Sequence, residues 1–489
     1  MSKKDIYDKI IGWFDERIGF TKTPLHDVPE YVLNPSYWLG ALALAAFLVQ
    51  GVTGAFQLLY YIPLPANAYN STMGVIQTVP LGHLIETLHF YGSYAMVGLA
   101  FGHLIRNYFG SVYKWRRELM WVVGVLMGIT TLGLGITGYL LPWTVVSKSA
   151  TDVAIGFLGF LPSRLADIAK FLVTGNGSDA AELKRFFDLH TVLLSFVLLF
   201  LFALKLYMYE VHLPSHTPTF GDGRSKYLNW FPTVFLYFLM LIGMYSAILI
   251  AAASIFPLHL PPEYSPQLAS EYVVQPDWYV MWLYQILKFE FFEGPNIPHA
   301  LYLATGLIIL LILLPFYDRS SEKLPSRRPV FTTVGLVILA EFIVLIIWGY
   351  LTPGQTIPLL SVIEIVGGTA AVVSVISFLM FRYLINPKKM ISSKEVDTKS
   401  KEPDNTQNSL NTKLFNKNFT LVIIFMVLLT LSSIVASSLF RMLIFTNINL
   451  LSLLASSIIL IGMILPMVWI IKYSVKIYEI EVKKIGIVK

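Results

Sequence analysis

The sequence has 489 residues, of which 55% are apolar and 13% are charged, a charged fraction about half that of soluble domains. This composition excludes an ordinary soluble enzyme and indicates a membrane protein. Cysteine is absent, which excludes disulfides, cysteine-ligated iron–sulfur clusters and covalent c-type haem attachment on this chain. The net charge of +6 is explained by basic loops on one side of a membrane, so we expect no nucleic-acid partner.

Ten apolar runs are long enough to cross a bilayer core of about 30 Å at about 1.5 Å per residue. We therefore expect an all-α polytopic membrane protein with about ten transmembrane helices. The segment before the first run is amphipathic and lacks a signal-peptide cleavage pattern, so we expect a surface helix that stays on the chain. The runs lie near residues 37–62, 84–109, 119–141, 188–211, 231–256, 299–316, 330–350, 358–384, 419–445 and 448–472.

The stretch 386–418 is polar and rich in lysine, which is typical of a flexible linker. We expect five parts: an N-terminal segment, a four-helix bundle, a second group of helices, this linker, and a two-helix extension with a basic tail. In chain order they span 1–36, 37–230, 231–385, 386–418 and 419–489.

Lysine and arginine are concentrated in the segments that share one membrane side with both termini. The positive-inside rule makes this side cytoplasmic, and we expect a multi-pass protein of a prokaryotic plasma membrane. The outer connections 142–187 and 257–298 are long, and connections of that length usually carry a function.

His89 and His103 lie 14 residues apart in the second run. Fourteen helical residues turn by about 1400° and rise about 21 Å, so both side chains face the same way at two depths. An intramembrane histidine is a functional candidate by default, and cofactors of helix bundles are held by side chains on facing helices. This pair therefore predicts two haem levels, although two unrelated polar residues remain an alternative.

Glycine repeats the same spacing, with Gly40 and Gly54 in the first run and Gly124 and Gly138 in the third. Two neighbouring helices thus have a bare patch at each depth, where a flat cofactor would fit. Close helix packing through small residues is the alternative explanation.

The fourth run contains His190 but has Leu204 where a second histidine would repeat the spacing. Lys205 is the ionisable side chain in the middle of this run, and a neutral lysine amine can ligate iron. A lysine that extends to the interface, or a haem without a ligand on that side, are the alternatives.

Arg106 and Arg185 lie near the two membrane surfaces. Guanidinium binds carboxylate well, so each is a candidate partner of haem propionates. An ordinary interfacial charge explains them almost equally well.

With these residues and several separated motifs, residues 37–385 resemble cytochrome b, the haem and quinone subunit of the cytochrome bc complexes. The motifs are QGVTG at 50–54, His89 and His103 with Arg106, GYLLPW at 138–143, RFFDLH at 185–190, PDWY at 276–279 and RRPV at 327–330.

The resemblance implies quinol oxidation at an outer site, coupled to proton translocation. One electron would pass to a Rieske iron–sulfur partner, and the other through two haems, b-type or modified, to a quinone at an inner site. By the family pattern His89 and His190 would hold the outer haem, and His103 with a residue of the fourth run the inner one. The implied partners are the quinone pool, a downstream cytochrome or oxidase, membrane lipid and a second copy in a homodimer.

Asp277 occupies the position of the family's glutamate, which is thought to accept a quinol proton. A carboxylate at the outer surface can act as such a base, although aspartate is one methylene shorter. The alternative is an N-cap for the helix that begins at Trp278. The residues that would line or frame the same pocket are Tyr139, Pro142, Trp143, Pro276, Trp278 and Tyr279.

Three departures from the family pattern affect the transfer of sites. The second histidine of the fourth run is missing, Glu86 replaces a frequent arginine, and Tyr237 and Phe238 stand where relatives carry charged residues. The inner quinone site is therefore not transferable, and the local candidates are Glu210 and His212.

We interpret the chain as the cytochrome b subunit of a respiratory quinol:acceptor oxidoreductase from a prokaryote. The aspartate of PDWY, the absence of cysteine and the two extra spans suggest an archaeal type. The first rival is a di-haem membrane anchor that passes electrons between a dehydrogenase and the quinone pool. The PDWY segment argues against it, because a conduit needs no outer proton acceptor. A non-redox transporter is the second rival.

Overall fold

The computed structural model describes residues 27–381, except residues 34, 115–116, 162, 176, 213–226 and 274. The expected linker and the last two expected helices lie outside the described residues, as does most of the N-terminal segment. Seven described helical stretches are long and apolar enough to cross a membrane. The 28-residue helix α4 is an eighth of sufficient length, and the all-α polytopic fold is confirmed.

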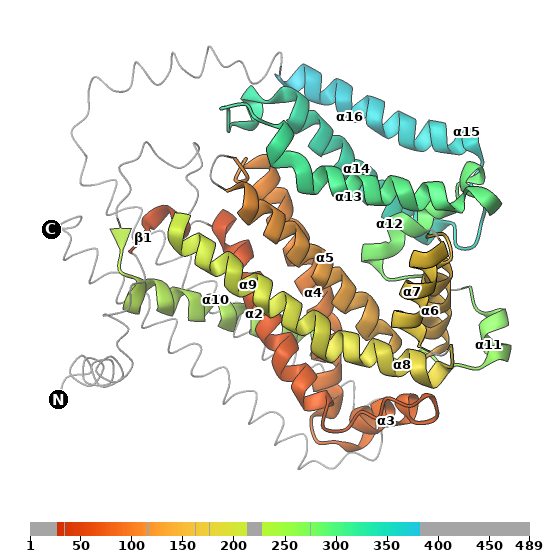
Figure 1. Ribbon diagram of the computed structural model, residues 1–489. Coiled ribbons are helices and arrows are strands. Elements are labelled where there is room, and N and C mark those ends of the chain that lie inside the picture. Colours follow the sequence, from red (N-terminus) through yellow and green to blue (C-terminus); the bar gives the residue numbers. More distant parts are fainter. Residues whose placement is uncertain are drawn as a thin grey trace, which may run out of the picture.

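Four long helices form the N-terminal half of the described chain (Figure 1). They are α2 (Pro35–Gln57), α4 (Gly82–Phe109), α5 (Glu118–Leu140) and a fourth helix built from α8 (Asp179–Asp188), the π-helical turn η3 (Leu189–Leu193) and α9 (Leu194–His212). Helix α2 packs along α4, and α5 packs along α9. This arrangement places the first and third apolar runs opposite the helices that carry the histidines.

The second half packs beside this bundle. Helix α10 (Phe235–Ile255) lies against α2 and α4, and α12 (Trp278–Leu287) packs on α14 (Pro329–Leu351). Figure 1 shows α12 between the bundle and the green to blue helices. The remaining members of that group are α13 (Ile297–Tyr317), α15 (Leu359–Val362), η8 (Ile363–Gly367) and α16 (Gly368–Leu379).

Short elements occupy the connections. Proline stands at the start of several helices, where its missing N–H and fixed φ are tolerated, and Thr144 and Ser147 form a capping box at the start of α6. The short elements are β1 (Val28–Pro29), η2 (Glu30–Leu33), α3 (Pro65–Thr78), α6 (Val145–Leu158), α7 (Ser163–Thr174), β2 (Tyr227–Leu228), η4 (Trp230–Val234), α11 (Pro266–Glu271), η5 (Glu290–Phe292), η6 (Gly294–Asn296) and η7 (Pro325–Arg327).

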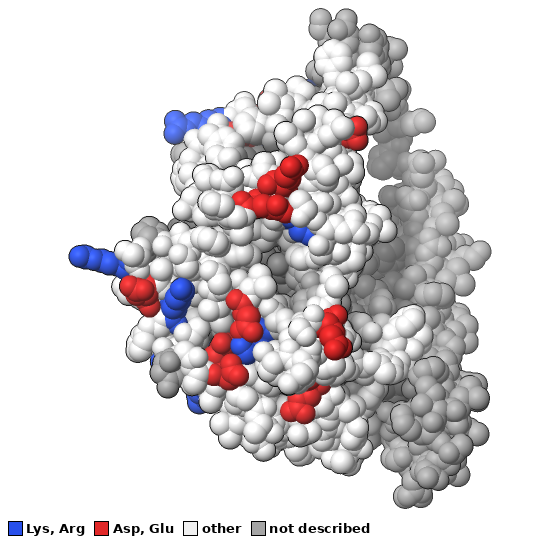
Figure 2. Space-filling view, turned by 90° about the vertical axis from the view of Figure 1, so that its right-hand side faces the viewer, with Lys and Arg blue, Asp and Glu red and all other residues white. Residues whose placement is uncertain are grey.

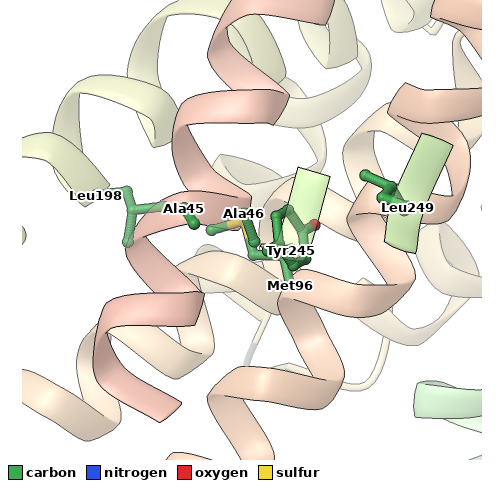
Figure 3. Packing of buried hydrophobic residues seen from close by; sticks show 6 residues of the cluster. All are labelled: Ala45, Ala46, Met96, Leu198, Tyr245 and Leu249. Atoms are coloured by element: carbon green, nitrogen blue, oxygen red, sulfur yellow. The ribbon is translucent and has the colours of Figure 1, made fainter. Parts of the chain in front are cut away.

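An apolar layer crosses the middle of the four-helix bundle (Figure 3). Its members lie about halfway between the two depths marked by the histidines and glycines, and Met96 is seven residues from both His89 and His103. The layer therefore separates the two depths by mostly apolar side chains, with the hydroxyl of Tyr245 as the polar side-chain group among its six members. It consists of Ala45, Ala46, Met96, Leu198, Tyr245 and Leu249.

A buried ionic cluster joins the α4–α5 connection to the α13–α14 connection. Tyr113 and Arg328 donate hydrogen bonds to Oδ2 of Asp318 at 2.5 and 2.6 Å, and Lys114 donates to Oδ1 at 3.0 Å. Burial alone would raise the pKa of Asp318, but these hydrogen bonds lower it below its usual value. The carboxylate stays charged and ties the two halves of the described chain together.

Candidate functional site

His89 of α4 and His190 of the π-helical turn η3 lie together at one depth of the bundle, which we call the outer level after the orientation expected from the sequence. Their ring centres lie 6.3 Å apart at an interplanar angle of 75°. Two imidazoles that bind one metal from opposite sides, with metal–nitrogen bonds of about 2.0 Å, have their ring centres roughly 6 Å apart. The structure thus brings together the two residues that the family resemblance implies as ligands of one haem, at a separation that suits a shared iron.

Both rings are oriented through Nδ1. His190 Nδ1 lies 2.9 Å from the Leu134 carbonyl oxygen, which only accepts, so Nδ1 is the donor. Thr53 Oγ1 donates to the Val49 carbonyl at 2.7 Å and lies 2.9 Å from His89 Nδ1, so it is available there as an acceptor. Both Nε2 atoms then carry the lone pair that a metal needs.

The π-helical turn explains how His190 reaches this position. It spans Leu189–Leu193 between two α-helical segments, and Ser195 Oγ donates to the His190 carbonyl at 2.7 Å. A π turn shifts the side chain away from the regular helical path, and such turns are frequent at functional sites.

Each glycine of the 14-residue pattern faces one candidate ligand. A Cβ added to Gly54 would lie 3.2 Å from His89 Cε1, and one added to Gly138 would lie 2.6 Å from His190 Cε1. At the inner level an added Cβ on Gly40 would lie 3.2 Å from His103 Cε1, and one on Gly124 would lie 2.9 Å from Lys205 Nζ. A side chain at any of the four would crowd the histidine or lysine that faces it, so the glycines leave room for these candidate ligands.

The inner level contains His103 and Lys205. Both side chains point into the bundle against the glycines of α2 and α5, and they are close enough for an electrostatic interaction with each other. Within the described residues no hydrogen bond holds His103 Nδ1 or Lys205 Nζ. The structure therefore places Lys205 at the depth of His103 rather than at the membrane interface.

The two candidate arginines differ in their surroundings. Arg106 lies over the Tyr37 ring at 4.1 Å and donates to Asn107 Oδ1, while its Nη2 is buried without a partner in the described part of the chain. Arg185 donates to the Leu172 carbonyl and packs on Phe171. The orphaned Nη2 of Arg106 suits an anionic group that belongs to a bound cofactor.

The carboxylate of Asp277 lies between two tyrosine hydroxyls. Tyr94 Oη donates to Oδ1 at 2.5 Å, and Tyr279 Oη donates to Oδ2 at 3.0 Å. Asp277 stands at the N-cap position of α12, but its side chain makes no capping hydrogen bond to a backbone N–H of that helix. Burial raises the pKa of Asp277 above its usual value, against the two hydrogen bonds, which lower it. A carboxyl group in this state is suited to take up a proton.

The remaining residues of the expected pocket frame this carboxylate. Tyr139 interacts electrostatically with Asp277, and Trp278 packs on Phe101, while Pro142 and Pro276 are half-buried in the adjoining connections. Trp143 is buried with a φ of +52°, a left-handed conformation that costs a non-glycine residue about 1–3 kcal/mol and is typical of functional sites.

A charged cluster around Lys148 lies beside the Trp143 ring. Lys148 Nζ lies 5.5 Å from the Trp143 ring centre and contacts the carboxylates of Asp152, Asp179 and Glu182. Burial alone would lower the pKa of Lys148, but these carboxylates raise it. Figure 2 views the end of the molecule that carries α6 and α11, where charged side chains form small groups on a mostly uncharged surface.

Glu210 and His212 lie at the far end of α9. His212 is the last residue of that helix, and its carbonyl accepts a hydrogen bond from Arg117 Nη2 at 2.8 Å. Arg117 precedes α5, whereas Tyr139, which interacts with Asp277, lies near the end of that helix, so the pair and Asp277 lie at opposite ends of α5.

Several residues of the site were not singled out in the sequence. Tyr94 is one of many aromatic residues in apolar runs, and the Leu134 carbonyl has no sequence signal at all. Gly135 leaves room for the Tyr279 hydroxyl, since an added Cβ would lie 2.9 Å from it. Thr53 had a signal, because it belongs to the QGVTG motif.

Two family models match the chain. "Cytochrome b(N-terminal)/b6/petB" matches residues 94–262, and "Cytochrome b(C-terminal)/b6/petD" matches residues 266–381. Cytochrome b of Sulfolobus acidocaldarius is 32% identical over 409 residues, with 77% of this chain and 71% of the relative covered. The chain belongs to the cytochrome b family.

Two further comparisons agree with this assignment. The cytochrome bc complex cytochrome b subunit of Chlorobaculum thiosulfatiphilum is 31% identical over 349 residues, with 69% of this chain and 80% of the relative covered. A solved structure titled "Hyperthermophilic respiratory Complex III" has the same fold, with a TM-score of 0.60 at 24% identity, covering 76% of this chain and 96% of that one. Membership of the cytochrome b family implies haem cofactors and a role in membrane electron transport.

Proposed function

We propose that this chain is the cytochrome b subunit of a bc-type quinol:acceptor oxidoreductase, and that Asp277 is the base at its outer quinol site. The observation that carries the proposal is the half-buried Asp277 carboxylate, which accepts hydrogen bonds from two neutral hydroxyls and has a raised pKa. Oxidation of one quinol to quinone releases two protons and two electrons. A carboxylate in this state takes one proton from a quinol hydroxyl as the O–H bond breaks.

Electrons leave the site by two routes. One electron passes to a Rieske iron–sulfur partner, which passes it on to a downstream cytochrome or oxidase. Haem supplies one-electron carriers when it is bound, with His89 and His190 as the outer ligands and His103 and Lys205 as the inner ones. The second electron reaches a quinone at an inner site near Glu210 and His212, and the two sites on opposite sides couple the reaction to proton translocation.

The membrane arrangement follows the distribution of charge. We expect both termini in the cytoplasm of a prokaryote, with 37–230 as the di-haem bundle and 231–385 as the quinol-site helices. Membrane lipid covers the apolar surface of α9, where Phe196 and Phe200 are each 67% exposed. A homodimer stays a prediction from the family resemblance.

Reduction of the bound haem by quinol tests the proposal in the purified complex. We expect a quinol to reduce haem, and an analogue that occupies the outer site to block that reduction. Haem reduction that is insensitive to the outer-site analogue would support the di-haem anchor instead. A complex without haem absorption would refute both.

Redox-resolved low-temperature spectra of Lys205→Ala test the inner ligand. We expect two haem signals in the wild type and a selective shift or loss of one of them in the variant. The control is Leu204→Ala, which removes the neighbouring apolar side chain from the same helix. If both signals are unchanged in Lys205→Ala, lysine is not the ligand; if the wild type has one haem only, the transmembrane electron route fails.

A further inference from the structure

Tyr94 and Tyr279 both donate hydrogen bonds to the Asp277 carboxylate. Each donates to a different carboxylate oxygen, and the Tyr94 bond of 2.5 Å is the shorter one. O–H···O⁻ bonds of about 2.5–2.7 Å are charge-assisted and are roughly twice as strong as neutral ones. The orientation of the carboxylate is therefore fixed by two helices, α4 and α12, that are far apart in the sequence.

The Tyr94 hydroxyl is itself held in place by ring packing. The Tyr94 ring centre lies 4.7 Å from that of Phe90, 6.4 Å from that of Tyr91 and 6.3 Å from that of Tyr279. Rings at these separations restrict one another. Tyr94 consequently presents its hydroxyl at one position rather than following the carboxylate.

The hydrogen bond from Tyr94 matters because the Asp277 side chain is short. The backbone of Asp277 is fixed at the start of α12, where its carbonyl accepts from the N–H groups of Val280 and Met281 at 2.9 and 3.1 Å. An aspartate side chain at this position is one methylene shorter than a glutamate, so its carboxylate reaches less far into the pocket. A donor that comes from α4 compensates for the missing length by drawing the carboxylate towards the bundle.

The other groups around Asp277 supply no opposite charge. Tyr94 faces it from α4, Tyr279 from α12, Tyr139 from α5 and Tyr350 from α14. All four are neutral hydroxyls, and within the described residues no cation acts on Asp277. The carboxylate therefore depends on the two hydrogen bonds for its stabilisation.

From this geometry we propose that Tyr94 is a positioning residue that holds the Asp277 carboxylate where it accepts the quinol proton. The inference rests on the proposed function and deepens it, because it names a residue that acts through Asp277 rather than on the quinol. Without the Tyr94 hydroxyl, Oδ1 loses its donor and the short side chain is free to turn away.

The pH profile of quinol oxidation by the purified complex tests this role with Tyr94→Phe. Hydrogen bonds to a carboxylate lower its pKa, so removal of one raises the pKa of Asp277 further. The rate falls as the pH falls through that pKa, and we expect the acid limb to move to higher pH. We expect kcat to fall about tenfold, as loss of one strong hydrogen bond implies, with little change in KM.

Tyr245→Phe is the matched control, because the Tyr245 hydroxyl is buried without a partner in the described part of the chain. We expect its pH profile to coincide with that of the wild type. A longer carboxylate should restore what Tyr94→Phe loses, so Asp277→Glu combined with Tyr94→Phe should recover most of the rate. Recovery of this kind would not follow if Tyr94 only stabilised the fold.

A difference infrared spectrum provides a readout that does not require turnover. The carboxyl band that disappears in Asp277→Asn should shift in Tyr94→Phe and stay in place in Tyr245→Phe. An active wild type with coincident profiles and unshifted bands in Tyr94→Phe would overturn the role of Tyr94 and leave the proposed function intact. A wild type that binds haem but oxidises no quinol would overturn the proposed function, and this inference with it.

Discussion

The outer and inner levels of the bundle share one geometry but differ in how their ligands are held. At the outer level, Thr53 and the Leu134 carbonyl fix the Nδ1 atoms of His89 and His190. At the inner level, the described residues provide no such bond for His103 or Lys205. Both levels have glycines beside their ligands.

The two levels therefore share the room beside their candidate ligands but differ in the hydrogen bonds that orient those ligands. The glycine pattern provides room for the candidate ligand side chains, and it is complete at both levels. The orientation of the ligands is prepared by the protein at the outer level, next to Asp277. At the inner level a bound cofactor would have to order its own ligands, for which we propose His103 and Lys205.

The largest effect is expected from filling the space at one level. Gly138→Leu would place a side chain where a Cβ already comes within 2.6 Å of His190. We expect loss of the outer haem and of quinol oxidation, with the inner haem signal retained. The haem-to-protein ratio and the spectrum of the purified complex measure this.

Gly128→Leu is the control on the same helix, since an added Cβ at Gly128 meets nothing within 4 Å. It should keep both haems. Gly124→Leu should lose the inner haem and keep the outer one. Equal loss of both haems in Gly138→Leu and Gly124→Leu would show that the levels are not independent.

Asp277→Asn tests the outer site without disturbing either level. A general base contributes typically about 10²–10⁴-fold to a rate, so we expect quinol oxidation to slow by about that factor while both haem signals stay unchanged. The wild-type rate should fall as the pH falls through the raised pKa of Asp277. The variant should lose this dependence.

Asp167→Asn serves as a control because Asp167 is exposed on α7. Its rate and pH profile should match those of the wild type. If Asp277→Asn retains the wild-type rate, the base lies elsewhere.

The sequence predicted the frame of the molecule well, because apolar length and helical periodicity are local properties. The eight helices follow the first eight apolar runs, and His89 and His103 share one face of α4, as 100° per residue requires. The periodicity also placed the four glycines on two depths. These features need no knowledge of which helices are neighbours.

The rest of the site depends on contacts between distant segments. The Tyr94–Asp277 bond joins residues 183 positions apart, and no local pattern connects them. The π-helical turn that carries His190 is invisible to hydrophobic periodicity. For Asp277 the sequence left a base and an N-cap as equal interpretations, and only the side-chain geometry shows that its carboxylate bonds to two tyrosine hydroxyls and makes no capping bond.

A smaller effect is expected from the residue that orients His89. Thr53→Val keeps the shape of the side chain and removes the acceptor for His89 Nδ1. Loss of such a partner costs typically about 10–100-fold in metal affinity, and we expect the lower end because packing still restrains the ring. Titration of haem retention against a competing apo-haem protein measures it.

Thr130→Val is the control for this change, because Thr130 Oγ1 bonds only to the Leu126 carbonyl of its own helix. It should retain outer haem as the wild type does. A loss of inner rather than outer haem in Thr53→Val would contradict the assignment of Thr53 to the outer level.

The smallest effect is expected from substitution of the two arginines. Here the inner haem should be affected and the outer one should not. Arg106 has a buried Nη2 without a partner in the described chain, whereas Arg185 is engaged by the Leu172 carbonyl and Phe171. Removal of a nearby positive charge makes reduction less favourable, so Arg106→Gln should lower the inner midpoint potential by roughly a few tens of millivolts, about 1 kcal/mol or less. Arg185→Gln should leave the outer potential unchanged in the same redox titration. A shift of the outer midpoint potential in Arg185→Gln would mean that the guanidinium leaves the Leu172 carbonyl and pairs with the cofactor. The protein would then bind the outer haem through a charge as well as through oriented ligands.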